Sequence, residues 1–158
     1  MFREMRRFKQ SLSDEKIIDI LKTEKRATLS VNGDDGYPYG IPVNFNYDEE
    51  KNKIYIHGAR EGHKIDAINN NNKVCFTTWT KGVQQENDWS YFVDSVIVFG
   101  RAKILTDEKE MLDALKSLGM KYYPTEQEVD AEIKKDFYRV GIIEINIEHV
   151  TGKHVHER

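Results

Sequence analysis

Hydrophobic and polar residues alternate over much of this chain with the two-residue period of β-strands. Turn residues separate the runs, most clearly in Asn32-Gly33-Asp34-Asp35-Gly36, which is typical of a hairpin. Together these signals predict six strands, which cover residues 27–31, 37–47, 53–58, 74–79, 91–105 and 140–147.

Helical signals are fewer and lie between the predicted strands. Ser13 and the acidic residues after it begin a helix that we expect to end near Lys25. A short helix over residues 61–70 opens with Gly62-His63-Lys64 and ends in a run of asparagines. A third helix begins at residues 106–108 and is expected to end at about Leu118, with Gly119 as its stop; residues 126–137 are charged and weakly helical.

Two residues place constraints on the predicted sheet. Pro42 cannot donate to a strand ladder, so its strand is expected at an edge or to be bulged there. Gly100 indicates a bulge or a close backbone approach within 91–105. The start of that strand is apolar on both faces and is therefore expected to be buried on both. Most connections are too short for parallel crossovers, so we predict a mainly β fold: a small six-stranded antiparallel barrel with flanking helices, which the family resemblance given below makes a split barrel.

Composition limits the function classes. The 158 residues fit one domain, residues 1–158, with an N-terminal arm (1–12) and a C-terminal tail (152–158). A hydrophobic content of 39% is lean, which favours a dimer. A net charge of −3 argues against nucleic acid as a partner. No apolar run reaches the ~20 residues that span a membrane, and no signal peptide is evident, so we expect a cytoplasmic protein.

The start of the helix at Gly62 carries an unusual charge pattern. The first turn of a helix normally collects Asp and Glu, because the N-terminus carries about half a positive charge. Here His63 and Lys64 stand side by side instead. Two such donors beside free backbone N–H groups indicate a bound anion, most naturally a phosphate.

Other chemistries have weaker support. His57, His63 and Lys64 could simply be surface residues, since exposed His and Lys are common. The five histidines show no recognisable metal-ligand spacing with cysteine or acidic partners, so no metal site is predicted. Neither a nucleophile elbow nor a glycine-rich nucleotide loop is present.

Several segments in order resemble one family. They are YPYGIPVNFNY, KIYIHGAREGHKIDAI, NNKVCF, DSVIVFGRAKIL and VTGKH. Over residues 3–153 the chain resembles the FMN-binding split-barrel proteins related to pyridoxamine 5′-phosphate oxidase, and within them the 5-nitroimidazole-resistance (Nim-like) branch. The resemblance implies FMN as cofactor, held in a groove between the two subunits of a homodimer.

The resemblance also assigns roles to residues. The backbone of Pro42, Val43 and Asn44 would follow the edge of the flavin ring. Residues around the ribityl chain and phosphate would be His57, Gly58, Ala59, His63 and Lys64. Ser95 and Val96 would approach the flavin from the other subunit. His57 is the candidate proton donor, because an unperturbed histidine has a pKa near neutrality.

The end of the chain departs from the vitamin oxidases. Those enzymes end in a Trp and Arg pattern, whereas this chain ends Thr151-Gly152-Lys153-His154-Val155-His156-Glu157-Arg158. We therefore do not carry the vitamin substrate over. The activity that the resemblance implies is flavin-dependent reduction of a small molecule, with a nitroaromatic such as a nitroimidazole as candidate substrate. Two alternatives are a flavin-binding protein without turnover and a split-barrel haem protein.

Overall fold

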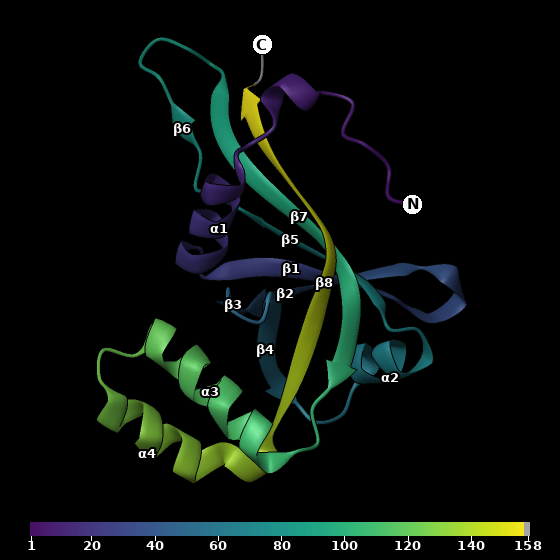
Figure 1. Cartoon of the computed structure of the whole chain (residues 1–158), viewed down its shortest axis with the longest axis vertical. Helices are drawn as coiled ribbons and strands as arrows, with labels where there is room; N and C mark the ends of the chain where they lie inside the picture. The colour runs from purple at the N-terminus through teal and green to yellow at the C-terminus, as the bar shows by residue number, and fades with distance from the viewer. Residues whose placement is uncertain (157–158) are drawn as a thin grey trace.

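The computed structural model describes residues 1–156 and shows a mainly β protein whose curled antiparallel sheet carries helices on its flanks (Figure 1). The strands are β1 (Arg26–Asn32), β2 (Pro38–Asn44), β3 (Asn46–Asp48), β4 (Lys53–Ala59), β5 (Lys73–Trp79), β6 (Val83–Gln84), β7 (Tyr91–Ile104) and β8 (Val140–His156). The helices are α1 (Asp14–Thr23), α2 (His63–Asn70), α3 (Glu108–Tyr122) and α4 (Glu126–Asp136), with short 3₁₀ turns at Phe8–Gln10, Asp34–Gly36 and Phe137–Arg139. The predicted split-barrel class is confirmed.

Two long strands, β7 and β8, form the spine of the sheet, whose order is β2-β1-β5-β7-β8-β4-β3 with β6 on β7. The register between β7 and β8 shifts at Phe99/Gly100, which confirms the predicted bulge. A Cβ at Gly100 would lie 2.4 Å from the carbonyl oxygen of Asn146, so only glycine fits there. As predicted for the strand that contains Pro42, β2 is at an edge and pairs only with β1 among the described strands.

The core has two parts. The larger lies inside the curled sheet beneath α1 and α2 and includes Ile20, Leu29, Phe45, Phe76 and Val96, all at most 1% exposed. The smaller part joins α3 to β4 and β8 through residues that include Tyr55, Leu105, Met111, Leu118 and Ile142. Because α3 packs on β4, the helical hairpin α3–α4 is held beside the strand that carries His57 (Figure 1). No helix in residues 1–156 is long and apolar enough to cross a membrane.

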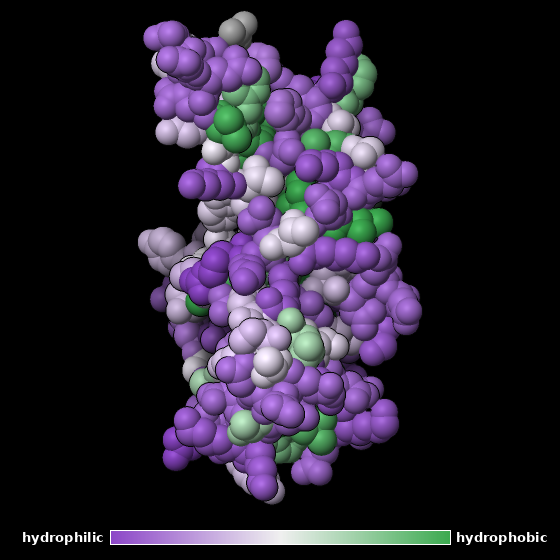
Figure 2. Space-filling view, turned by 90° about the vertical axis from the view of Figure 1, so that its left-hand side faces the viewer, coloured by the Kyte–Doolittle hydropathy of each residue, from purple (hydrophilic) through white to green (hydrophobic). Residues whose placement is uncertain are grey.

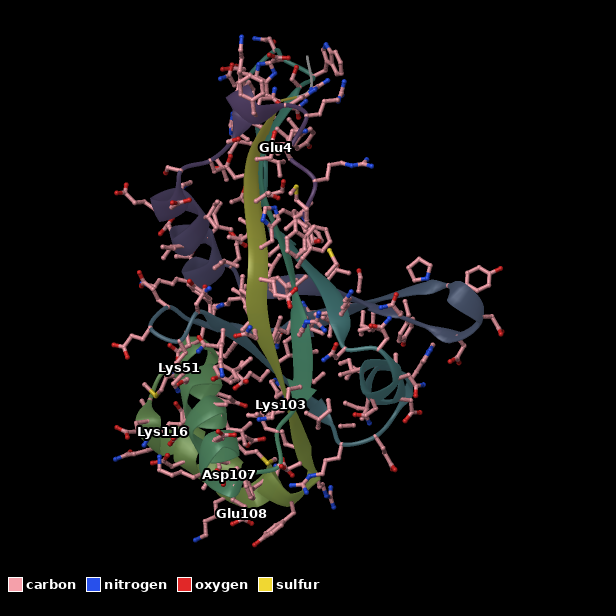
Figure 3. The ribbon with its side chains drawn as sticks, turned by 45° about the vertical axis from the view of Figure 1, so that its right-hand side comes forward. Glu4, Lys51, Lys103, Asp107, Glu108 and Lys116 are labelled. Carbon is pink, nitrogen blue, oxygen red and sulfur yellow. The ribbon has the colours of Figure 1, made fainter. Side chains whose placement is uncertain are left out.

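The outer face of β7 differs from the prediction. The start of this strand was expected to be buried on both faces, but Ile97 is 37% and Phe99 is 40% exposed, whereas Val96 and Val98 are fully buried. The expectation was wrong for a single chain, because only the N-terminal arm lies on that face. The ring of Phe2 stacks on Phe99, with centroids 5.7 Å apart. Glu4 marks the arm beside the upper part of β8 in Figure 3.

Several element boundaries also differ. α3 continues past Leu118 and Gly119 to Tyr122, because Val129 of α4 packs where a side chain at position 119 would be, 2.5 Å from such a Cβ. The strand predicted over 37–47 is interrupted at Phe45. Residues 81–90, which lie between two predicted strands, contain β6. β8 does not end at residue 147 but pairs with β7 as far as residue 156, so much of the expected tail is strand; residues 157–158 lie outside the described part.

Candidate functional site

The start of α2 has free backbone donors that could hold an anion. Gly62 adopts φ 125°, a conformation open to glycine, and its carbonyl accepts hydrogen bonds from the backbone of Ile65 and Asp66. The backbone N–H groups of His63 and Lys64 have no acceptor among the described residues, and no side chain caps the helix. These two donors add to the positive end of the helix dipole. One acidic residue, Asp66, belongs to the same turn.

Lys64 reaches back from α2 onto β4. Its Nζ lies 3.0 Å from the position that a Cβ would take at Gly58, so glycine leaves the room that the ammonium group occupies. The same charge acts on His57, whose pKa is lowered first by burial and then by Lys64. At neutral pH the imidazole of His57 is therefore mainly uncharged, and it retains one N–H donor.

His63 points elsewhere than Lys64. Its ring stacks on Tyr39 of the β1–β2 hairpin, with centroids 4.2 Å apart and planes 16° from parallel. Its Nε2 lies 3.6 Å from a carboxylate oxygen of Asp34, which is highly exposed. The hairpin tip and the helix start thus share one polar corner, and His63 is positioned there by an aromatic neighbour.

Residues 42–44, which were expected to follow the edge of a flavin ring, lie in β2, at the edge of the sheet. Pro42 is exposed, the side chain of Val43 is buried in the core, and Asn44 is half-buried. The Oδ1 of Asn44 accepts a hydrogen bond from Arg26, 2.7 Å away, which leaves the amide nitrogen of Asn44 as a donor without a partner in residues 1–156. Since β2 is an edge strand, Asn44 is one of the polar groups that a ligand could reach.

Asn44 and His57 both line one cavity. The cavity has a volume of about 390 Å³ and lies between these two residues and the α3–α4 hairpin. That volume lies within the range of roughly 300–1,000 Å³ that is usual for small-molecule sites. Tyr122 lines it as well, and its hydroxyl group holds the backbone at Phe45, where β2 and β3 are interrupted.

The remaining predicted residues do not all join this group. Ala59 is exposed at the end of β4, next to Gly58. Ser95 lines a separate cavity of about 240 Å³ on the outer face of β7 and β8. Val96 is fully buried and gives no side chain to that face. In one chain, Ser95 and His57 line different cavities.

The sequence reasoning missed two features. Tyr122 lies beyond the predicted end of the third helix, although the structure places it in the last turn of α3, in contact with Phe45. The cavity was missed because residues 126–137 show little amphipathic pattern. A periodic signal did exist in Val129, Ile133 and Phe137, which recur every four residues and all line the cavity.

The fold places the chain in the class of small antiparallel split barrels with helices on their flanks. The chain belongs to the pyridoxamine 5′-phosphate oxidase family, whose model matches residues 13–154. No curated protein matches the chain.

Solved structures share the fold at low identity. One is a protein from Bacteroides thetaiotaomicron provisionally assigned to 5-nitroimidazole antibiotic resistance; it is 23% identical, with 92% of this chain and 87% of that chain covered and a TM-score of 0.75. Another is the conserved hypothetical protein Rv2991 from Mycobacterium tuberculosis, with 16% identity, coverages of 96% and 90%, and a TM-score of 0.79. The FAD binding protein from Mycobacterium smegmatis has 19% identity, coverages of 94% and 99%, and a TM-score of 0.68.

Proposed function

We propose that this chain binds FMN without a covalent bond and uses it to reduce a small molecule. The observation that carries the proposal is the start of α2, where Lys64 lies over Gly58 and two backbone N–H groups have no acceptor. A phosphate accepts hydrogen bonds from such donors and is favoured by the helix dipole. Membership of a family named for an oxidase supports a redox role, and the M. smegmatis neighbour is an FAD binding protein.

The proposal includes a homodimer with the flavin between its subunits. Ile97 and Phe99 are exposed apolar residues beside Ser95 on the outer face of β7, where a second copy would bury them. The arm already covers part of this face through Phe2, so a partner would pack against the arm or displace it. Ser95 of one subunit would then reach the site formed by the other.

When bound, the flavin supplies the electrons of the reduction. The chain's own residues hold and polarise it. Lys64 and the N–H groups of α2 bind the phosphate, and the free amide nitrogen of Asn44 donates to an acceptor at the ring edge. His57 presents its ring N–H beside the site. A bound phosphate offsets the charge of Lys64 and thereby raises the pKa of His57 toward its ordinary value, which increases the fraction of His57 that carries a proton to donate at neutral pH. The candidate acceptor is a nitroaromatic compound.

The absorption spectrum of the purified protein tests the cofactor. A flavin band, with FMN identified after release by chromatography against FAD and riboflavin standards, is the expected result. A Soret band would overturn the proposal in favour of a haem protein. If flavin is bound, anaerobic reoxidation of the reduced protein by a nitroimidazole tests turnover. A rate no higher than that of free reduced FMN would leave a flavin-binding protein without this activity.

A second experiment tests the phosphate site itself. Lys64→Ala should weaken FMN binding by roughly 10- to 100-fold, as expected for a hydrogen bond to a charged group, and should leave riboflavin binding unchanged. His63→Ala should weaken FMN binding as well. The matched control is Lys51→Ala, since Lys51 is exposed on the opposite side of the molecule from α2 (Figure 3). Equal losses for FMN and riboflavin would show that Lys64 does not bind the phosphate.

A further inference from the structure

The cavity between β4 and the α3–α4 hairpin is separate from the start of α2. It is bounded by the strand residues Asn44 and His57 on one side and by the two helices on the other. The phosphate site at the start of α2 contributes no residue to its lining. At about 390 Å³ it has room for a one- or two-ring organic molecule.

The walls of this cavity are apolar and aromatic. Aliphatic side chains come from both helices, among them Leu118 of α3 and Ile133 of α4. Three rings also line it, those of Tyr122, Tyr123 and Phe137. The outside of the hairpin is predominantly hydrophilic (Figure 2), so its apolar residues are concentrated toward the cavity and the sheet. Such walls bury the body of an apolar ligand, and the ring faces attract a cation.

The charges that face the cavity are all negative. Glu132 and Asp136 are the charged side chains in the lining, and neither has a hydrogen-bond or ion-pair partner in residues 1–156. They are four positions apart on α4 and therefore adjacent on its surface, where like charges repel. The nearby Lys116 does not neutralise them, because it pairs with Glu126 and Asp130. Among the described residues that line the cavity, the basic side chain is His57, whose lowered pKa leaves it mainly uncharged at neutral pH.

We propose that this cavity is a binding site for a hydrophobic organic cation, a molecule with an aromatic or aliphatic body and a protonated amine. The body lies among the aliphatic and aromatic walls, and the ammonium group lies between Glu132, Asp136 and the ring faces. A phosphorylated ligand does not suit the cavity, because no cation lines it. The site is distinct from the proposed phosphate site, but Asn44 and His57, which border it, are also proposed to contact the flavin.

The test uses three probes of the same shape and different charge: naphthylmethylammonium, naphthylmethanol and naphthoate. Isothermal titration of the full chain at low salt should give the tightest binding for the ammonium probe and the weakest for naphthoate. The double variant Glu132→Gln/Asp136→Asn should bind the ammonium probe roughly tenfold more weakly and should bind the alcohol as before. Glu108→Gln is the control, because Glu108 lies at the beginning of α3 and outside the cavity (Figure 3).

Two results would overturn the proposal. One is equal affinity for the three probes, or an unchanged ammonium affinity in the double variant, which would remove the role of the carboxylates. The other is the absence of binding by any of the probes. FMN affinity is measured on the same double variant and should equal that of the unmodified chain. A protein that binds the ammonium probe but no flavin would refute the proposed function alone.

Discussion

The hydroxyl group of Tyr122 hydrogen-bonds to the backbone of Phe45, where the sheet is interrupted between β2 and β3. Its removal gives the most specific stability prediction. β2 ends at Asn44 and β3 begins at Asn46, so Phe45 lies outside both strands although it is fully buried. Its backbone N–H donates to the Tyr122 hydroxyl over 2.9 Å. The hydroxyl in turn can donate to the carbonyl of Lys25, 2.6 Å away, or to that of Phe45, 2.9 Å away.

Tyr122→Phe removes one oxygen atom and keeps the ring. The buried N–H of Phe45 then has no acceptor, which costs about 1–3 kcal/mol, so we expect a loss of ~2 kcal/mol in the free energy of unfolding. For a chain of this length such a loss lowers Tm by about 4–8 °C. Urea unfolding followed by circular dichroism measures it, with an unchanged m-value as the sign that only stability has changed.

Tyr138→Phe is the matched control, because Tyr138 is 81% exposed and loses the same atom. It should remain within about 0.5 kcal/mol of the unmodified chain. If Tyr122→Phe and Tyr138→Phe unfold at the same urea concentration, the hydroxyl does not hold the backbone at Phe45. The position of Asn44, the neighbouring residue, would then need another explanation.

Three further predictions follow from close contacts and shifted pKa values. Gly119→Ala should destabilise the chain despite the better helix propensity of alanine, because its Cβ would lie 2.5 Å from Val129. Adding Val129→Ala should recover part of the lost stability, which a double-mutant cycle of thermal unfolding measures. Burial lowers the pKa of Lys121 to about 8 from 10.5. Between these pH values the unfolded chain binds more protons than the folded chain, so the free energy of unfolding should increase as the pH rises from 8 to 10.5. In Lys121→Met this rise should be absent from urea midpoints measured across the same range; identical profiles would contradict the shift. Finally, Lys64→Ala should raise the pKa of His57 in an NMR titration of the flavin-free protein, because one of the two causes that lower it is removed, and an unchanged pKa would place Lys64 too far away to act.

Much of the fold follows from local signals. The alternation of apolar and polar residues determines which face of each strand is apolar, and turn residues determine where strands end. These signals sufficed for the class of fold, the edge position of Pro42 and the bulge at Gly100. The free donors at the start of α2 could also be predicted from the sequence, because the dipole of a helix and its free N–H groups are properties of the helix end itself.

The predicted ends of helices and strands were wrong where a residue distant in the sequence determines them. α3 passes through Gly119 because Val129 packs there, and β8 continues to His156 because β7 pairs with it along its length. The exposure of Ile97 and Phe99 is a similar case. An apolar pattern says that a face needs cover, but it does not say whether the chain itself or a second copy supplies that cover.

The candidate sites divide along the same line. By itself the sequence predicted an anion site at Gly62-His63-Lys64, since its three residues are neighbours in the chain. Only the tertiary structure decided that Lys64 lies over Gly58, that His63 stacks on Tyr39, and that a cavity with negative charge opens beside His57. The contact of Tyr122 with Phe45 joins residues 77 positions apart. No local pattern encodes such a contact, because it forms only once the sheet has curled and the helical hairpin has packed against it.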